Sequence, residues 1–238
     1  MTLLLIDGDI IAYKAATSAE VPINWGDGLW TLHAYEQDVE ARLEEQITKL
    51  MEAPVQDCII ALTDTTNFRK TIAPYYKLNR KEVRKPMLLK WAREYLMSTY
   101  NTIIYKGLEA DDVLGILGSS NKETIIWSAD KDLLTIPAKH WINGEVVTVT
   151  EEEADYQFYY QTLVGDNTDN YKGCPSVGAI KAEKILKDDC SWEAVVNAFK
   201  AQGLSEEVAL ENARLARILR NGEYDTDTGE VKLWEPKK

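Results

Sequence analysis

Carboxylic acids recur in five short segments of this 238-residue chain, and most of these segments follow a stretch of apolar residues. Ligand sets made only of oxygen select hard cations such as Mg²⁺ or Mn²⁺. Two such ions about 3.5–4 Å apart can clamp the attacking and leaving oxygens of a phosphodiester and lower the pKa of a water. That chemistry needs neither histidine nor cysteine, and the chain has only two histidines and three cysteines. The acids are Asp7 and Asp9; Asp64; Glu109, Asp111 and Asp112; Asp130 and Asp132; and Asp166 and Asp169.

Each acid taken alone has an ordinary structural explanation. An Asp after a strand often caps a helix, and acids suit the first turn of a helix because of its dipole. Asp9, Asp112 or Asp132 alone fits that explanation as well as a ligand role. The whole set does not, because so many carboxylates at one edge would repel strongly in a low dielectric. The set therefore needs cations, and it indicates an enzyme that hydrolyses phosphodiester bonds.

A basic strip runs from Arg69 to Arg93. It holds nine Lys or Arg residues and one acid, Glu82, for a local net charge of +8. The whole chain carries −12, so the remainder carries −20. Two tyrosines and a tryptophan lie among the basic residues. This is more than a solvated helix face requires, and it indicates contact with nucleic acid.

The elements that would position these residues alternate between strands and helices. Apolar residues at steps of three or four predict an amphipathic helix at 32–51, and further helices are expected at 91–100 and 111–117. The run 145–149 is expected to form an edge hairpin with Trp141. The alternation predicts an α/β fold with a mostly parallel central sheet and flanking helices, which binds ligands beyond the carboxyl ends of its strands. The predicted strands are 3–6, 58–62, 102–105 and 124–127.

The second part of the chain is predicted to be helical, at 151–163, 177–186, 192–199 and 205–219. We therefore divide the chain into a core, residues 1–150, which includes the basic strip around 69–93, and a C-terminal helical subdomain, residues 151–238. No Pro/Gly linker separates them, so we expect one compact unit. The segment 225–230 is interpreted as a hairpin turn rather than a calcium loop, because it lacks the third ligand and the distal Glu.

Several classes of protein are disfavoured by what the sequence lacks. It has no Walker A loop, no Gly-x-Gly-x-x-Gly turn and no Cys-x-x-Cys pair. No apolar stretch approaches the roughly 20 residues that span a bilayer. The first apolar run ends at Asp7, which is too short for a signal peptide. We therefore expect a cytoplasmic monomer without a membrane partner.

Five motifs occur in an order that resembles one known family. They are Ile6-Asp-Gly-Asp9; Thr63-Asp-Thr-Thr-Asn-Phe-Arg69 with Tyr76-Lys-Leu-Asn-Arg80; Glu109-Ala-Asp-Asp112; Ser128-Ala-Asp-Lys-Asp-Leu133; and Gly165-Asp-Asn-Thr-Asp-Asn170, which leads into 173–186. Over about residues 3–187 the chain resembles the flap endonuclease and 5′–3′ exonuclease superfamily, whose core is PIN-like. Its C-terminal part is similar to that of the 5′–3′ exonucleases of short-tailed bacteriophages.

The resemblance implies a metal-dependent 5′–3′ exonuclease, with flap or structure-specific endonuclease activity beside it. It also implies two bound ions, Mg²⁺ or Mn²⁺. Lys77 and Arg80 would be catalytic residues that approach the scissile phosphate from a helical arch. Tyr76 would stack on a terminal base. The metal ligands would be Asp7, Asp64, Glu109, Asp111, Asp112, Asp130, Asp132, Asp166 and Asp169.

The resemblance further implies a helix–two-turn–helix motif at about 165–187 that holds the duplex backbone. Its glycines would expose backbone N–H groups at a helix start, a phosphate site blind to sequence, and K⁺ is a candidate ligand of the turn. The expected partner is DNA with a 5′ end or flap, or an RNA–DNA hybrid, in phage replication, primer removal or host DNA degradation. The DNA-binding residues would be Arg69, Tyr76, Lys81, Arg84, Lys85, Gly173, Gly178 and Lys181.

Two other functions are open at this point. A haloacid-dehalogenase-type phosphatase could use Asp7 and Asp9 as nucleophile and general acid, but it leaves 109–112 and 130–132 unexplained. A non-catalytic DNA-binding scaffold of replication would need the acids only for structure. The chain also departs from the family at Asp9, an additional acid, and at 171–174, where Tyr-Lys-Gly-Cys replaces the more usual Ile-Pro-Gly.

Overall fold

The computed structural model describes residues 2–236, and its centre is a six-stranded sheet in the order β5-β4-β1-β6-β7-β8. All neighbouring pairs are parallel except β7 and β8, which form the predicted edge hairpin. The α/β fold class with a mostly parallel sheet is thereby confirmed. The strands are β1 (Leu3–Asp7), β4 (Asp57–Ala61), β5 (Thr102–Ile103), β6 (Thr124–Trp127), β7 (Lys139–Ile142) and β8 (Glu145–Thr148).

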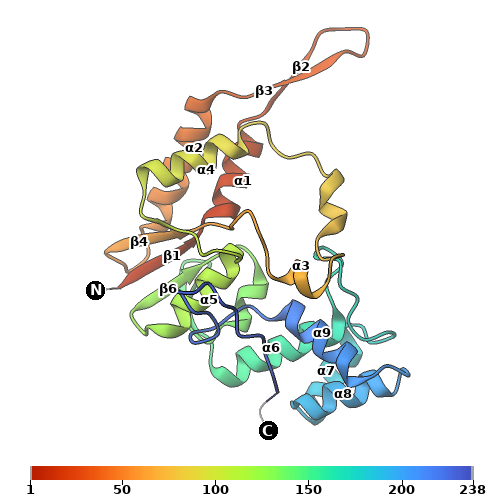
Figure 1. Ribbon diagram of the computed structural model, residues 1–238. Coiled ribbons are helices and arrows are strands. Elements are labelled where there is room, and N and C mark those ends of the chain that lie inside the picture. The colour runs from red at the N-terminus through yellow and green to blue at the C-terminus, as the bar shows by residue number, and fades with distance from the viewer. Residues whose placement is uncertain (1, 237–238) are drawn as a thin grey trace.

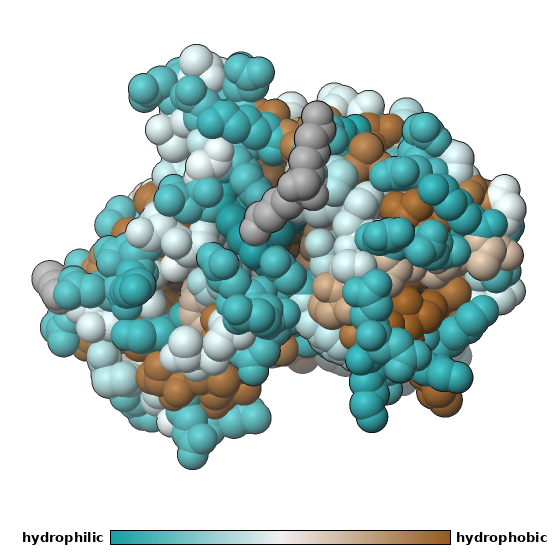
Figure 2. Space-filling view, turned by 90° about the horizontal axis from the view of Figure 1, so that it is seen from below, coloured by the Kyte–Doolittle hydropathy of each residue, from teal (hydrophilic) through white to brown (hydrophobic). Residues whose placement is uncertain are grey.

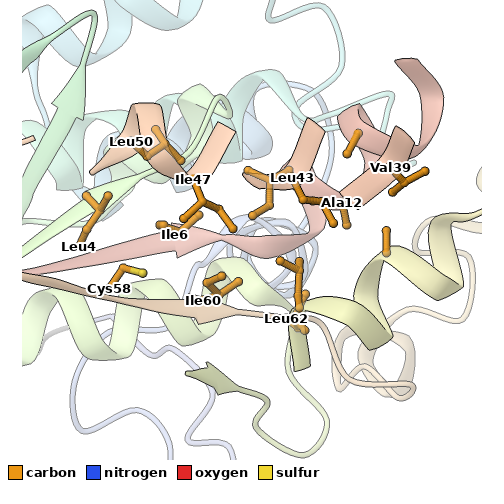
Figure 3. Packing of buried hydrophobic residues seen from close by; sticks show 14 of the residues in the cluster. Leu4, Ile6, Ala12, Val39, Leu43, Ile47, Leu50, Cys58, Ile60 and Leu62 are labelled. Atoms are coloured by element: carbon orange, nitrogen blue, oxygen red, sulfur yellow. The ribbon is translucent and has the colours of Figure 1, made fainter. Parts of the chain in front are cut away.

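The residues of β1 point alternately into two hydrophobic layers, as the two-residue repeat of a strand requires. Leu4 and Ile6 pack with α1 (Gly8–Ser18), α2 (Glu36–Leu50) and α4 (Leu89–Thr99) on one face of the sheet (Figure 3). Leu5 belongs to the cluster on the other face. The helix α2 contributes residues at the predicted steps of three or four, namely Val39, Leu43, Ile47 and Leu50.

The second face of the sheet is covered by α5 (Ala110–Ser120) and by the segment that follows the last helix. Ile218 and Leu219 are buried beside Leu5 and Leu114. A Cβ on Gly115 of α5 would lie 2.2 Å from the carbonyl oxygen of Leu219, so only glycine permits this approach. The C-terminal segment therefore completes the core of the sheet domain, and the two parts of the chain form one unit (Figure 1).

The helical part consists of α6 (Glu151–Val164), α7 (Ala179–Asp188), α8 (Trp192–Lys200) and α9 (Glu206–Ala216). Thr150 caps α6 and forms a capping box with Glu153, which explains why the helix begins there. The helices enclose their own cluster, with Leu163 and Phe199 fully buried. Seen from below, the surface is mostly hydrophilic and its hydrophobic residues form separate patches (Figure 2). Within residues 2–236, no helix has the length and apolar character to cross a membrane.

The segment 21–35 differs from the prediction. The helix predicted at 32–51 begins only at Glu36, because Leu32 lies in β3 (Trp30–His33), which pairs with β2 (Val21–Asn24) in an antiparallel hairpin. The spacing of Leu32, Tyr35 and Val39 fits a helix equally well, and this misplaces the boundary. The Gly-Asp-Gly sequence at 26–28, whose three residues have positive φ, is the turn signal that favours the hairpin. The hairpin projects from the body of the molecule (Figure 1).

The basic strip forms an irregular connection beside the sheet, and we refer to residues 69–93 as the arch (Figure 1). It contains α3 (Arg69–Ile72), the 3₁₀ helix η1 (Leu78–Glu82) and the start of α4. The predicted turn at 225–230 is also present: the N–H of Asp225 donates to Glu230 O, and that of Gly229 donates to Asp225 O.

Candidate active site

A cavity of 1190 Å³ opens beside the carboxyl ends of the parallel strands. Asp9 and eight of the nine predicted metal ligands line it, whereas Asp112 does not. The arch supplies the basic residues of the lining: Arg69, Lys70, Lys77, Arg80, Lys81, Lys85 and Arg93. The fold thus brings acids from five separate segments to one place, together with the basic strip.

Asp7 is positioned by the join between β1 and α1. Its carboxylate accepts the Ile10 N–H at 3.1 Å and the Ser128 hydroxyl at 2.8 Å. The next residue is glycine because a Cβ on Gly8 would lie 2.5 Å from Ile60 Cγ2 and 2.7 Å from the carbonyl oxygen of Ala61. In this Asp-Gly pair, Asp7 provides a carboxylate in a fixed position, and Gly8 allows α1 to pack closely on β4.

Several carboxylates of the cavity, Asp7 among them, raise one another's pKa. Burial raises the pKa of Asp7, and the charge of Asp130 adds to that rise. Burial and then the charge of Asp7 raise the pKa of Asp111 well above its usual value. The pKa of Asp132 is raised to about 6 by burial, by Asp130 and by Asp166. These groups disfavour one another's ionised forms, and a cation among them would relieve that cost.

The donor set therefore fits a hard divalent cation in its chemistry. The lining includes neither histidine nor cysteine, and oxygen ligands suit Mg²⁺ or Mn²⁺. As the side chains stand, no group of three or more His, Cys, Asp or Glu among residues 2–236 is arranged to hold a metal ion. Basic residues of the arch are paired with several of the acids instead.

The arch cations reach directly into the carboxylates. The Lys77 ammonium pairs with Glu109 and lies 3.4 Å from Asp169. Arg80 donates to Asp169 Oδ1 at 2.5 Å. Lys77 precedes η1 in a left-handed conformation, φ 54°, and its N–H donates to the carbonyl oxygen of Asp169 at 2.9 Å. Burial would raise the pKa of Glu109, but the charges of Lys77 and Arg69 outweigh it and hold that pKa at about 2.

Asp64, after β4, is held by hydrogen bonds. It accepts the Thr66 hydroxyl at 2.6 Å and the Gly107 N–H at 2.7 Å, and these bonds lower its pKa to about 2. Thr66, Ser128 and Gln161, which interacts with Asp132, are partners that the sequence did not single out. Thr66 and Ser128 lay in recognised motifs, whereas Gln161 did not. Their spacing from the acids they hold differs in each case, so no common pattern marks them.

Two predicted DNA contacts are wrong because their side chains are buried. Tyr76 is 2% exposed, and its hydroxyl donates to Glu109 and Asp169 at 3.0 and 2.7 Å, so the ring is not free to stack on a base. Arg69 is also 2% exposed and pairs with Asp112 and Glu109. Both residues hold the base of the arch against the acids.

Two other arch residues pair with acids in α1 or just after it. Arg84, a predicted DNA contact, forms a two-pronged ion pair with Glu20 at 2.6 and 2.7 Å. Arg93 pairs with Asp9 and donates to the carbonyl oxygen of Thr63 at 2.6 Å, while Asp9 accepts the Thr63 N–H. Asp9 therefore serves to attach α4 beside the end of β4.

The predicted helix–two-turn–helix is only partly arranged as expected. Gly173 is buried, and its N–H donates to Asn212 Oδ1 at 3.0 Å, so this donor is not available to a phosphate. It is glycine because a Cβ there would lie 2.4 Å from the backbone nitrogen of Gly165. Gly178 and Lys181 are exposed at the start of α7, with open space around Gly178.

A parallel sheet with acids at its carboxyl edge and a basic arch beside them defines an α/β nuclease of the PIN-like class. The chain belongs to the 5′–3′ exonuclease family, because residues 2–166 match its N-terminal resolvase-like domain. The predicted family and fold are confirmed. So is the prediction of a 5′–3′ exonuclease that hydrolyses phosphodiester bonds, while the phosphatase and the scaffold find no support.

Individual relatives agree with this assignment. The exonuclease of Escherichia phage T7 is 29% identical, with 98% of this chain and 93% of the relative covered. The exodeoxyribonuclease of Enterobacteria phage T3 is 29% identical over 99% of this chain and 93% of the relative. The T5 D15 protein, co-crystallized with metal ions, has the same fold at a TM-score of 0.67 and 17% identity, with 91% of this chain and 89% of that one covered.

Proposed function

We propose that this exonuclease degrades DNA and depends on divalent ions, Mg²⁺ or Mn²⁺, held at the carboxylates of the cavity. The observation that carries the proposal is the meeting of eight predicted ligands with the cations of the arch in one cavity. The T3 relative is named an exodeoxyribonuclease, and the T5 protein of similar fold was crystallized with DNA and metal ions, which supports the same chemistry here.

The residues that would hold the ions are Asp7, Asp111, Asp130 and Asp132, joined by Asp64, Glu109, Asp166 and Asp169. The ions would supply a counter-charge for the phosphate and a lowered pKa for the attacking water. Lys77 and Arg80 exchange their carboxylate partners for phosphate oxygens when DNA enters, because charge-assisted hydrogen bonds to phosphate are strong. They then stabilise the charge that develops in the transition state.

The other residues of the proposal bind DNA. Lys81 and Lys85 are exposed at the cavity and attract the backbone without regard to sequence. Gly178 and Lys181 hold the duplex at the start of α7, where K⁺ is a further ligand. On this division, residues 1–150 carry most of the chemistry, and residues 151–238 grip the duplex and add Asp166 and Asp169 to the ligands. The proposed substrates are 5′ ends and flaps of DNA and RNA–DNA hybrids, and the proposed active form is a monomer.

The test uses one duplex labelled either at its 5′ end or at its 3′ end. With Mg²⁺, the 5′ label should be released early as short product, and the 3′-labelled strand should shorten from the opposite end. Chelator should abolish both signals, and Asp111→Asn should reduce them severely. Full activity in chelator would refute metal dependence. Shortening from the 3′ end would refute the polarity.

A further inference from the structure

Asp112 differs from the other predicted ligands in its surroundings. It is 0% exposed and does not line the cavity. Its Oδ2 accepts from Arg69 Nη1 at 2.7 Å and from the Glu109 N–H at 3.2 Å. Its Oδ1 accepts from Arg69 Nη2 at 2.7 Å and from the Leu219 N–H at 3.1 Å. A carboxylate has about four acceptor positions, so none is left for a metal ion.

Arg69 is saturated in the same way. A guanidinium has five N–H donors, and the structure gives each an acceptor. Two go to Asp112, and one to Glu109 Oε2 at 3.3 Å. The others go to the carbonyl oxygens of Leu215 at 3.0 Å and Arg217 at 2.5 Å. Nothing remains for a DNA phosphate.

The pair joins three parts of the chain that are far apart in sequence. Arg69 begins α3 at the base of the arch, Asp112 lies in the first turn of α5, and Leu215–Leu219 end the helical part. The first turn of α5 also carries Asp111, and Glu109 is its N-cap. Both of these side chains line the cavity.

We propose that Asp112 is a positioning residue and not a metal ligand: with Arg69 it anchors the arch to the segment that presents Glu109 and Asp111. This rests on the proposed function, in which those two acids hold the ions. To bind an ion, Asp112 would have to give up its bonds to Arg69. That would leave the buried guanidinium with Glu109, at 3.3 Å, as its one remaining carboxylate partner in the structure, which is unfavourable.

The experiment compares Asp112→Asn with Asp111→Asn in the full chain without DNA. Mn²⁺ binding is measured by titration calorimetry, and the arch is probed by limited trypsin digestion, with cleavage mapped after Lys81 and Arg84, which are both exposed. Asp112→Asn should keep the wild-type number of Mn²⁺ ions, bind them several-fold more weakly, and be cut in the arch about ten times faster. Asp111→Asn should lose an ion and keep the arch protected.

A second variant guards against simple loss of folding. The double variant Arg69→Gln, Asp112→Asn leaves no lone buried charge, so its arch should be better protected and its Mn²⁺ affinity higher than in Asp112→Asn. Additive defects in the double variant would refute the anchor. Loss of an ion in Asp112→Asn with a protected arch would show that Asp112 is a ligand. Failure of the wild-type chain to bind Mn²⁺ would refute the proposed function instead, and the digestion would still decide the anchor.

Discussion

Lys77 and Lys85 both belong to the arch and line the same cavity, yet they should affect different steps. The Lys77 side chain is 17% exposed and reaches Glu109 and Asp169, whereas Lys85 is exposed. We compare Lys77→Met with Lys85→Met, because methionine removes the charge but keeps most of the apolar stem. Glu109 keeps Arg69 and Tyr76 as partners in the first variant, so the fold should survive.

The expected sizes follow from where each ammonium lies. Lys77 is placed at the carboxylates, where charge develops on the phosphate, and loss of one positioned donor costs about 100–1,000-fold in rate, or roughly 2.7–4.1 kcal/mol of barrier. Lys85 can only lose one phosphate contact. That should weaken DNA binding several-fold and reduce the slope of log affinity against log salt by about 0.9.

The assay is single-turnover cleavage of a 5′-labelled duplex at saturating enzyme and Mg²⁺, with DNA affinity measured separately at several salt concentrations. Saturation removes binding effects, so the first variant should stay slow and the second should recover the wild-type rate. Recovery of Lys77→Met at saturation would mean that Lys77 only binds DNA. If Lys85→Met were equally slow at saturation, Lys85 would affect the chemical step too, and the proposed difference between the two lysines would be wrong.

Three further outcomes follow from the geometry. Without metal and near neutral pH, Asp111→Asn should melt at or above the wild-type temperature. Burial and a neighbouring carboxylate raise the pKa of Asp111 in the folded protein, so the ionised side chain destabilises the fold. A lower melting temperature would contradict this. Gly115→Ala should lower the melting temperature by roughly 3–10 °C, since overpacking against a backbone oxygen 2.2 Å away costs about 1–3 kcal/mol; an unchanged melting curve would count against it. Gly178→Val should melt within a few degrees of wild type, as its Cβ meets open space, but bind duplex several-fold more weakly at every sequence; unchanged affinity would remove Gly178 from the DNA-binding surface.

The arrangement of the sheet was predictable because its determinants are local. Short runs of β-branched and aliphatic residues between amphipathic segments predict buried parallel strands, and acids that follow such strands must meet at one edge. Asp7 is the last residue of β1, and Asp64, Glu109 and Asp130 lie a few residues after β4, β5 and β6. The order of the strands is therefore enough to predict that these four acids lie close together.

What the sequence did not reveal is which side chains are buried and with whom. Arg69 and Tyr76 lie in a basic, aromatic strip that is typical of a nucleic-acid surface, but their partners are 33 to 148 residues away in sequence. The same limit applies to Asp112, which a family motif marks as a ligand and whose partner Arg69 becomes visible only when the chain is folded. The β2–β3 hairpin was missed for a local reason, because helical spacing continues by chance from Leu32 into α2.

The charges of the arch also explain how an acidic protein can act on DNA. Outside the arch the chain carries a net −20, which repels a phosphate backbone. In the structure much of the arch charge is already committed, because Lys77, Arg80 and Arg93 pair with acids of the cavity and Arg84 pairs with Glu20. Under the proposed function, divalent ions neutralise the acids and leave Lys77 and Arg80 free for phosphate. The ions would take the place of Lys77 and Arg80 beside the acids, and the DNA phosphates would take the place of the acids beside Lys77 and Arg80. Binding of the ions therefore favours binding of DNA, and binding of DNA favours binding of the ions.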